Sequence, residues 1–261
     1  MDETFLDSNH AIPEANIRAL KRMKELGVLF VPSSGRWYSS IMHNFAAVDA
    51  SLLEGGYVLS YNGGFINRVG DPCPLTTCGL SRDCAEQLYQ KGLELGLSMH
   101  INVADADDDE RAYLTSISGV THISSADYPD LSFLDGRDIV KILFVNRNFD
   151  ALQKLGGDLE PLAQRLGVEI TFSSKRYLEF MPAGVNKGVG LMRLAEMLGI
   201  PMSEVIAVGD SANDLSMIQA AGLGVGVANV TDDVRPHCDG ALETTGMDGA
   251  FEELVERYLE A

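Results

Sequence analysis

Basic residues are scarce in this sequence of 261 residues. Lysine and arginine number 20 against 38 acidic residues, which gives a formal net charge of −18 at pH 7. Because such a surface repels a polyanion, the composition argues against nucleic acid as a partner. An anionic substrate would need a bound cation and a few well-placed basic side chains to reverse the local field.

Long hydrophobic runs and secretory features are also absent. No stretch approaches the roughly 20 apolar residues that a membrane-spanning helix needs, which argues against insertion into a membrane. The first ten residues, MDETFLDSNH, are acidic and polar, the opposite of a secretory signal peptide. We therefore expect a cytoplasmic protein without a membrane partner.

Cysteine is rare as well. The four cysteines stand at 73, 78, 84 and 238, with no C-x-x-C element, and the nearest histidines do not complete a zinc pattern. We expect free, reduced thiols, as is usual in a reducing compartment.

Apolar runs alternate with helical patterns at both ends of the chain. Strands are predicted at 28–32 (VLFVP), 57–62 (YVLSYN), 205–209 (VIAVG) and 223–228 (LGVGVA). Strands that alternate with helices indicate an α/β fold with a parallel sheet. A middle segment, 82–181, reads as an α/β insert between core parts 1–81 and 182–261. Its acidic run at 105–110 lacks the glycine turn of a calcium loop, so we interpret it as a solvated loop rather than a cation site.

The segment VGDSAND at 208–214 carries the strongest chemical signal. An apolar strand runs into Asp210, and a helix begins within a few residues, which places the acid at the carboxyl end of a strand, where open α/β folds bind ligands. The turn lets Asp210 and Asp214 face one point, an arrangement that suits Mg²⁺. Asn213 stands at the helix start, where backbone N–H groups could hold a phosphate. The alternative is an ordinary turn with aspartate and asparagine caps.

GDSAND resembles the fourth motif of haloacid dehalogenase-type phosphatases, specifically the Cof-like branch with a large cap of the second type. The resemblance implies a Rossmann-like parallel-sheet core with an inserted α/β cap at 82–181. It also implies that Asp210 binds Mg²⁺, that Asp214 supports the metal site, and that Asn213 helps to hold the phosphoryl group.

MPAGVNKG at 181–188 resembles the third motif of this family. The resemblance makes Lys187 the catalytic, phosphate-binding lysine. A lysine that opens a helix beside a carboxylate cluster would neutralise charge on the nucleophile and on the transferring phosphoryl oxygens. Considered by itself, Lys187 is interpreted as an ordinary surface lysine; the presence of the motif at 208–214 reverses that interpretation.

VPSSGR at 31–36 resembles the second motif, in which this branch usually has Thr-Gly-Arg. Ser34 then donates its hydroxyl to a phosphate oxygen, and the replacement of threonine by serine keeps that hydroxyl. Gly35 lets the backbone approach the ligand. We expect Arg36 to pair with a nearby carboxylate rather than to touch the substrate.

The N-terminal MDETFL matches the first motif, D-x-D-x-T, only from its second position. Asp2 then takes the general acid/base position at the metal site, Thr4 takes the threonine position, and the nucleophilic aspartate would precede Met1 together with the central strand. Reading Asp2 as the nucleophile would put Thr4 at the acid/base position, out of register. Either the native protein begins earlier and is an enzyme, or this is a pseudoenzyme that binds phosphorylated ligands without turnover.

The resemblance implies an Mg²⁺-dependent phosphomonoester hydrolase that acts through an aspartyl-phosphate on small phosphorylated metabolites, such as sugar phosphates or phosphorylated cofactors. Lys187, Ser34 and the metal would stabilise charge on the phosphoryl oxygens. Asp2 would protonate the leaving oxygen and then activate water. A phosphomutase would share these motifs but transfer the group to a second sugar hydroxyl. The motifs do not select one substrate, and they carry no signal for an oligomeric state.

Overall fold

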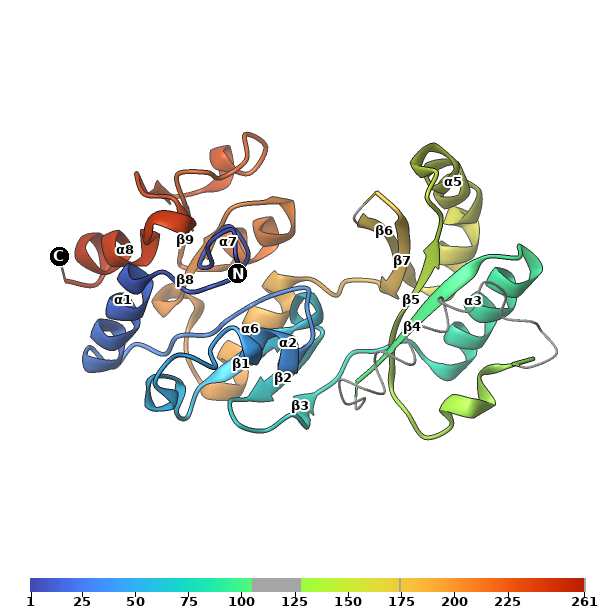
Figure 1. The fold of residues 1–261 in the computed structure, drawn as a ribbon, viewed down its shortest axis with the longest axis horizontal. Coiled ribbons are helices and arrows are strands. Elements are labelled where there is room, and N and C mark those ends of the chain that lie inside the picture. The colour runs from blue at the N-terminus through green and yellow to red at the C-terminus, as the bar shows by residue number, and fades with distance from the viewer. Residues whose placement is uncertain (105–127, 174, 261) are drawn as a thin grey trace. The chain divides into compact units, whose positions relative to one another are not determined.

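The computed structural model describes residues 1–104, 128–173 and 175–260. The chain divides into two compact units (Figure 1). The core unit consists of 1–76 and 185–261, and the inserted unit consists of 77–184. The acidic run at 105–110 lies outside the described residues. The assignment of 82–181 as a cap that closes over a site stays a prediction.

Both units contain helices and strands in alternation. The elements of the core unit are α1 (Glu14–Glu25), α2 (Tyr38–His43), β1 (Tyr57–Ser60), β2 (Phe65–Arg68), β3 (Pro74–Thr76), α6 (Lys187–Leu198), β8 (Ile206–Gly209), α7 (Leu215–Ala220), β9 (Leu223–Gly226), β10 (Gly240–Ala241) and α8 (Ala250–Tyr258). Those of the inserted unit are α3 (Arg82–Glu94), β4 (Ser98–Val103), β5 (Ile139–Val145), α5 (Phe149–Leu166), β6 (Val168–Ser173) and β7 (Tyr177–Pro182). The α/β class predicted from the sequence is confirmed.

The core unit has two three-stranded sheets. One is parallel, in the order β10-β9-β8, and the other is antiparallel, in the order β1-β2-β3. The prediction of a strand at 28–32 is wrong, because among the described residues only the bridge between Ser33 and Leu59 joins this region to β1. Residues 28–32 have a strand on one side only, and their other side faces an apolar cavity. The two sheets therefore stop on either side of that cavity.

Aromatic packing fixes the N-terminal segment on the core unit. The ring of Phe5 lies 4.9 Å from that of Phe30 and 4.8 Å from that of Phe251, centroid to centroid. Phe5 is almost fully buried. Burial of this size is worth roughly 2–3 kcal/mol for one large apolar side chain. The position of the residues just before Phe5 is thus set by the hydrophobic core.

The inserted unit has its own hydrophobic core. Its four strands form an antiparallel sheet in the order β4-β5-β7-β6. Apolar side chains from α3, α5 and the sheet form one buried cluster, in which the rings of Phe144 and Phe180 lie 4.9 Å apart. Gly156 lets α5 approach the sheet, because a Cβ there would stand 2.8 Å from the ring of Phe172.

The cysteines at 73, 78, 84 and 238 form no disulfide with one another in the structure. Within the described ranges, no helix is both long enough and apolar enough to cross a membrane.

Glu253 on α8 ties that helix to the strand-end loop at 243–244. Its carboxylate accepts the backbone N–H groups of Glu243 and Thr244, at 2.9 to 3.0 Å, and a 2.7 Å bond from Arg257. Burial acts to raise the pKa of Glu253, but these hydrogen bonds outweigh it and lower the pKa to about 2. The ionised carboxylate therefore stabilises the fold.

Replacing Glu253 with glutamine should lower the free energy of unfolding by about 2 kcal/mol at pH 7. Because the folded pKa is depressed, the wild-type contribution is full above the ordinary value near 4.5 and is lost as the pH falls toward 2. Urea unfolding of both proteins from pH 7 to pH 2.5 should show the difference shrinking. Glu256→Gln, an exposed position on the same helix, is the control. A difference that does not depend on pH would contradict this assignment.

Candidate active site

Asp210 and Asp214 lie in the turn that connects β8 to α7. One carboxylate oxygen of Asp214 accepts the backbone N–H of Asp210 at 3.0 Å and that of Ser211 at 3.3 Å. Gly209 precedes them, and a Cβ there would stand 2.4 Å from the Cβ of Asp214. The glycine is therefore needed so that the side chain of Asp214 can fold back over the strand end.

Lys187 is the first residue of α6, and it reaches the same turn. Its Nζ lies 2.5 Å from Oδ1 of Asp214, and both side chains are buried, at 3% and 2% exposed. Burial acts to raise the pKa of Asp214, but the charge of Lys187 outweighs it and holds the pKa below its ordinary value. The helices approach closely here because Gly188 has no Cβ; one would stand 2.4 Å from the carbonyl oxygen of Ser216. A buried, paired lysine is not an ordinary surface lysine.

Asp210 is buried and is bonded to Thr4. The Thr4 hydroxyl donates to Oδ1 of Asp210, and both residues are less than 10% exposed. In the described part of the chain, this hydroxyl is the only hydrogen-bond donor to the Asp210 carboxylate. A single hydrogen bond offsets little of the cost of burying a charged carboxylate, so this carboxylate favours a nearby cation.

Asn16 holds the backbone next to Thr4 in place. Its side-chain amide donates to the carbonyl oxygens of Phe5 and Gly246, at 2.9 and 3.3 Å, and its carbonyl accepts the N–H of Phe251 at 3.1 Å. Asn16 is fully buried. Three segments that are distant in the sequence thus meet at one side chain.

Replacing Asn16 with alanine should lower the free energy of unfolding by about 3 kcal/mol, because three buried backbone groups lose their partner. Urea denaturation measures this. Asn9→Ala, at an exposed position, should change it by less than about 0.5 kcal/mol. If the two substitutions lowered the free energy of unfolding equally, the hydrogen bonds of Asn16 would not be what holds the three segments together.

Asp2 lies in the loop just before Thr4, with its carboxylate partly exposed. Oδ1 lies 3.2 Å from Nδ1 of His10 and 3.4 Å from Nη2 of Arg36. The expected pairing of Arg36 with a nearby carboxylate is therefore observed. It connects the loop at 31–36 with the N-terminal segment.

The Met1 amino group lies among the charges of the same site. Burial is the largest cause that lowers its pKa to about 6, and the charge of Lys187 acts in the same direction. Asp214, Asp2 and Asp210 act in the opposite direction. Residues from the N-terminal loop, from α6 and from the β8–α7 turn are therefore close enough to interact electrostatically.

Ser34 and Gly35 lie on the loop that follows residues 28–32. Ser34 is buried, its N–H donates to the carbonyl of Leu59 at 3.0 Å, and its Oγ accepts the N–H of Arg36 at 3.2 Å. A Cβ on Gly35 would stand 3.1 Å from the side-chain oxygen of Asn62. The hydroxyl hydrogen of Ser34 can donate to a ligand, but no direct contact joins Ser34 to Lys187 or Asp210 within the described residues.

Asn213 does not join this cluster. It is exposed, and its side-chain oxygen accepts the hydroxyl of Ser211 at 3.1 Å. Over the described ranges, no three Asp, Glu, His or Cys side chains converge as a preformed metal site. Asp210 fits a cation by its burial and sparse partners, whereas Asp214 is occupied by Lys187 and Asp2 faces His10 and Arg36.

Three residues of this site were not singled out from the sequence as site residues. Thr4 had been placed only by its position in the first motif, Arg36 only as a pairing partner, and His10 not at all. For His10 the sequence holds no signal, because its partner Asp2 is eight residues away in an irregular loop. Spacing arguments work on helices and strands, not on such loops.

Comparison with known proteins places the chain in a family. The sequence model for haloacid dehalogenase-like hydrolases matches residues 1–254. The putative phosphatase YxeH of Bacillus subtilis (strain 168) is 28% identical, over 98% of this chain and 96% of that protein. The HMP-PP phosphatase of Cronobacter sakazakii is 32% identical, over 88% of this chain and 82% of that protein.

Solved structures show the same fold. A haloacid dehalogenase-like hydrolase from Bacteroides thetaiotaomicron matches with a TM-score of 0.75 and 25% identity, over 98% of this chain and 96% of that chain. A protein from Thermotoga maritima matches with a TM-score of 0.79 and 21% identity, over 98% and 94% of the two chains. Sequence and fold agree along nearly the whole length. The chain belongs to the haloacid dehalogenase-like hydrolases, among relatives of the Cof-like type.

Proposed function

We propose that the core unit is the catalytic core of an Mg²⁺-dependent phosphatase of small phosphomonoesters. Relatives in this family are phosphatases of small phosphorylated metabolites. They include HMP-PP phosphatases and 5-amino-6-(5-phospho-D-ribitylamino)uracil phosphatases, which are 24% to 32% identical to this chain. The proposed substrates are therefore sugar phosphates or phosphorylated cofactors.

The buried pair of Lys187 and Asp214 beside Asp210 is the observation that supports this function most. A strongly acidic chain keeps a lysine at 3% exposure at the first position of a helix, next to a second buried acid. Helix N-termini and lysines both favour phosphate groups. Lys187 would bind a phosphoryl oxygen and, with Ser34, stabilise the negative charge that develops during transfer.

Asp210 is the residue that we propose as the anchor for Mg²⁺. A bound Mg²⁺ supplies positive charge beside the phosphoryl oxygens. Asp2 would stand next to Asp210 as a further oxygen ligand, and Asp214 would act by holding Lys187 and the backbone of the turn. Thr4 keeps the Asp210 carboxylate oriented. Asn213, which the sequence suggested for the phosphoryl group, is the weakest member because it is exposed.

Asp2 is proposed as the general acid and base. Its partly exposed carboxylate would protonate the leaving oxygen and then take a proton from the attacking water. His10 and Arg36 both approach Oδ1 and would fix the orientation of this carboxyl group. The nucleophile is proposed to be an aspartate joined ahead of Met1, so that the chain as given would bind phosphorylated ligands without turnover.

Phosphate release from a panel of sugar phosphates and phosphorylated cofactors tests the proposed function. The chain as given is compared with a form that carries an apolar strand ending in aspartate ahead of Met1, each with Mg²⁺ or with a chelator. We expect release only from the extended form with Mg²⁺. Release from the chain as given would refute the proposed position of the nucleophile. Isomerised sugar phosphates without phosphate release would indicate a phosphomutase.

A further inference from the structure

A turn of left-handed backbone follows β1 in the core unit. Tyr61, Asn62 and Gly63 have φ angles of 50°, 55° and 82°. Glycine adopts this conformation freely, but two adjacent residues with side chains rarely do, because the left-handed conformation brings Cβ too close to the following carbonyl oxygen. Strained backbone of this kind persists only where the surrounding structure holds it, and it is frequent at functional sites. The contacts of the turn therefore indicate what it does.

Backbone hydrogen bonds join the first half of the turn to the loop that carries Ser34. The N–H of Asn62 donates to the carbonyl oxygen of Ser34 at 2.9 Å, and the N–H of Tyr61 donates to that of Arg36 at 3.0 Å. The side chain of Asn62 also lies over Gly35, which has no Cβ to keep it away. Each of the residues 34–36 thus contacts the turn, so the turn sets the position of this loop.

The second half of the turn packs against the start of α6, backbone to backbone. A Cβ on Gly63 would stand 2.8 Å from the carbonyl oxygen of Asn186, and a Cβ on Gly190 would stand 2.4 Å from the Cα of Gly63. Asn186 caps this helix, because its side-chain oxygen accepts the N–H of Val189 at 3.0 Å. The turn therefore meets α6 on both sides of Lys187.

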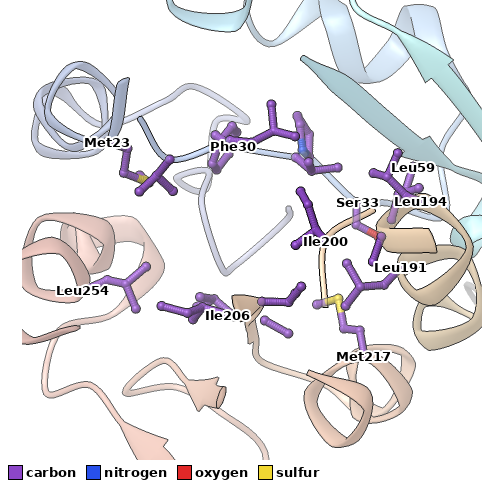
Figure 2. Close-up of a pocket in the computed structure, with 18 of the residues that line it drawn as sticks. Met23, Phe30, Ser33, Leu59, Leu191, Leu194, Ile200, Ile206, Met217 and Leu254 are labelled. Atoms are coloured by element: carbon purple, nitrogen blue, oxygen red, sulfur yellow. The ribbon is translucent and has the colours of Figure 1, made fainter. Parts of the chain in front are cut away.

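Apolar packing holds α6 against the two strands that flank the turn. β1 ends at Ser60 and β2 begins at Phe65, with the turn between them. Leu194 of α6 belongs to one buried cluster with Leu59 of β1 and Ile66 of β2. The side chains of Leu59 and Leu194 lie beside each other at one end of the apolar cavity (Figure 2). Because α6 cannot move away freely, an added atom between α6 and the turn must displace the turn.

We propose that the left-handed turn at 61–63 is a positioning element that sets the Ser34 hydroxyl and the Lys187 ammonium group around one phosphate. Within the described residues no hydrogen bond joins Ser34 to Lys187, but the turn is bonded to the loop of the first and packs on the helix start of the second. The proposal rests on the proposed function, in which both groups bind phosphoryl oxygens. Displacing a positioned group by about 1 Å can cost about 100-fold in its effect.

The backbone of Asn62, and not its side chain, carries this role. The side-chain oxygen of Asn62 is buried but has no hydrogen-bond partner in the described part of the chain, so its amide does not hold the turn. Glycine at this position should keep the left-handed conformation, whereas alanine, which disfavours it, should displace the turn. A direct contact of the Asn62 side chain with phosphate would instead be lost in both variants.

Four variants of the full chain test the proposal: Asn62→Gly, Asn62→Ala, Gly190→Ala and the control Gly157→Ala. Gly157 lies within α5, and a Cβ there meets nothing within 4 Å, so the control repeats the change from glycine to alanine without a new contact. The readouts are the dissociation constant of inorganic phosphate with Mg²⁺ present, the shift of the thermal midpoint by Mg²⁺ alone, and the amide resonances of residues 34–36.

Gly190→Ala should weaken phosphate binding by about 10-fold and shift the amide resonances of residues 34–36, because the displaced turn moves that loop. Asn62→Ala should weaken phosphate binding by about 5-fold, and Asn62→Gly and Gly157→Ala should change it by less than about twofold. All four variants should keep the Mg²⁺ shift, because within the described residues no hydrogen bond joins the turn to Asp210. A merely structural role would lower the responses to phosphate and to Mg²⁺ together, and that result would overturn the proposal.

Two further outcomes would overturn it. One is equal phosphate affinity in Gly190→Ala and Gly157→Ala, and the other is an equal loss in Asn62→Gly and Asn62→Ala. A wild-type chain that binds no phosphate would contradict the proposed function instead. The amide resonances of residues 34–36 need no phosphate, so resonances that stay unchanged in Gly190→Ala would by themselves show that the turn does not connect α6 to this loop.

Discussion

Lys187→Met is expected to lower the free energy of unfolding by about 3–5 kcal/mol, because it leaves the buried Asp214 without its countercharge. Asp214 is 2% exposed along its side chain, so water cannot replace the ammonium group. The same substitution should abolish the binding of inorganic phosphate. Urea unfolding measures the first effect, and calorimetric titration with phosphate in the presence of Mg²⁺ measures the second.

A double substitution, Lys187→Met with Asp214→Leu, separates the two effects. Replacing both partners of a buried ion pair by apolar residues is often neutral or stabilising, so most of the lost stability should return. Phosphate binding should not return, because the positive charge is still missing. If phosphate binding recovered together with stability, Lys187 would be a structural residue and not a ligand of the phosphoryl group.

Asp210→Asn is expected to remove the response of the protein to Mg²⁺. A ligand present at 100 times its dissociation constant stabilises the folded state by about 2.7 kcal/mol, and this gain should disappear in the variant. The amide keeps an oxygen for the Thr4 hydroxyl, so the fold without metal should change little. In the form that carries the nucleophile, phosphate release should fall by about 1000-fold.

Asp232→Asn is the matched control for this experiment. Asp232 is exposed and lies on a loop of the same unit, so its replacement removes the same charge without touching the site. It should keep the full stabilisation by Mg²⁺. Equal losses in the two variants would mean that Mg²⁺ acts through the net charge of −18 and not through Asp210.

The site residues that the sequence predicted lie at the ends of regular helices and strands, where the local sequence pattern sets their position. Asp210 follows an apolar strand and Lys187 opens a helix, and both features can be read from the hydrophobic pattern and the glycines beside them. The structure adds that Gly209 and Gly188 each permit a close approach at the site, because a Cβ on either would clash with its neighbour. Local pattern therefore placed the strand end and the helix start.

The parts that the sequence did not predict depend on distant partners. Residues 28–32 have the composition of a strand, but a strand needs a neighbour on its edge, and composition does not reveal whether one is present. The orientation of Asp2 toward His10 and Arg36, and the anchoring by Asn16, come from irregular loops. Hydrophobic periodicity in the sequence does not predict contacts between irregular loops.

The relaxation of the ³¹P resonance of phosphate, with Mn²⁺ in place of Mg²⁺, tests most directly whether a metal and a phosphate meet at Asp210 and Lys187. Mn²⁺ prefers the same oxygen ligands, and its unpaired electrons speed the relaxation of a nearby phosphorus. Fast relaxation is predicted with the wild-type chain, and it should be lost in both Asp210→Asn and Lys187→Met. Relaxation as fast in the Asp210→Asn variant as in the wild type would contradict a shared site.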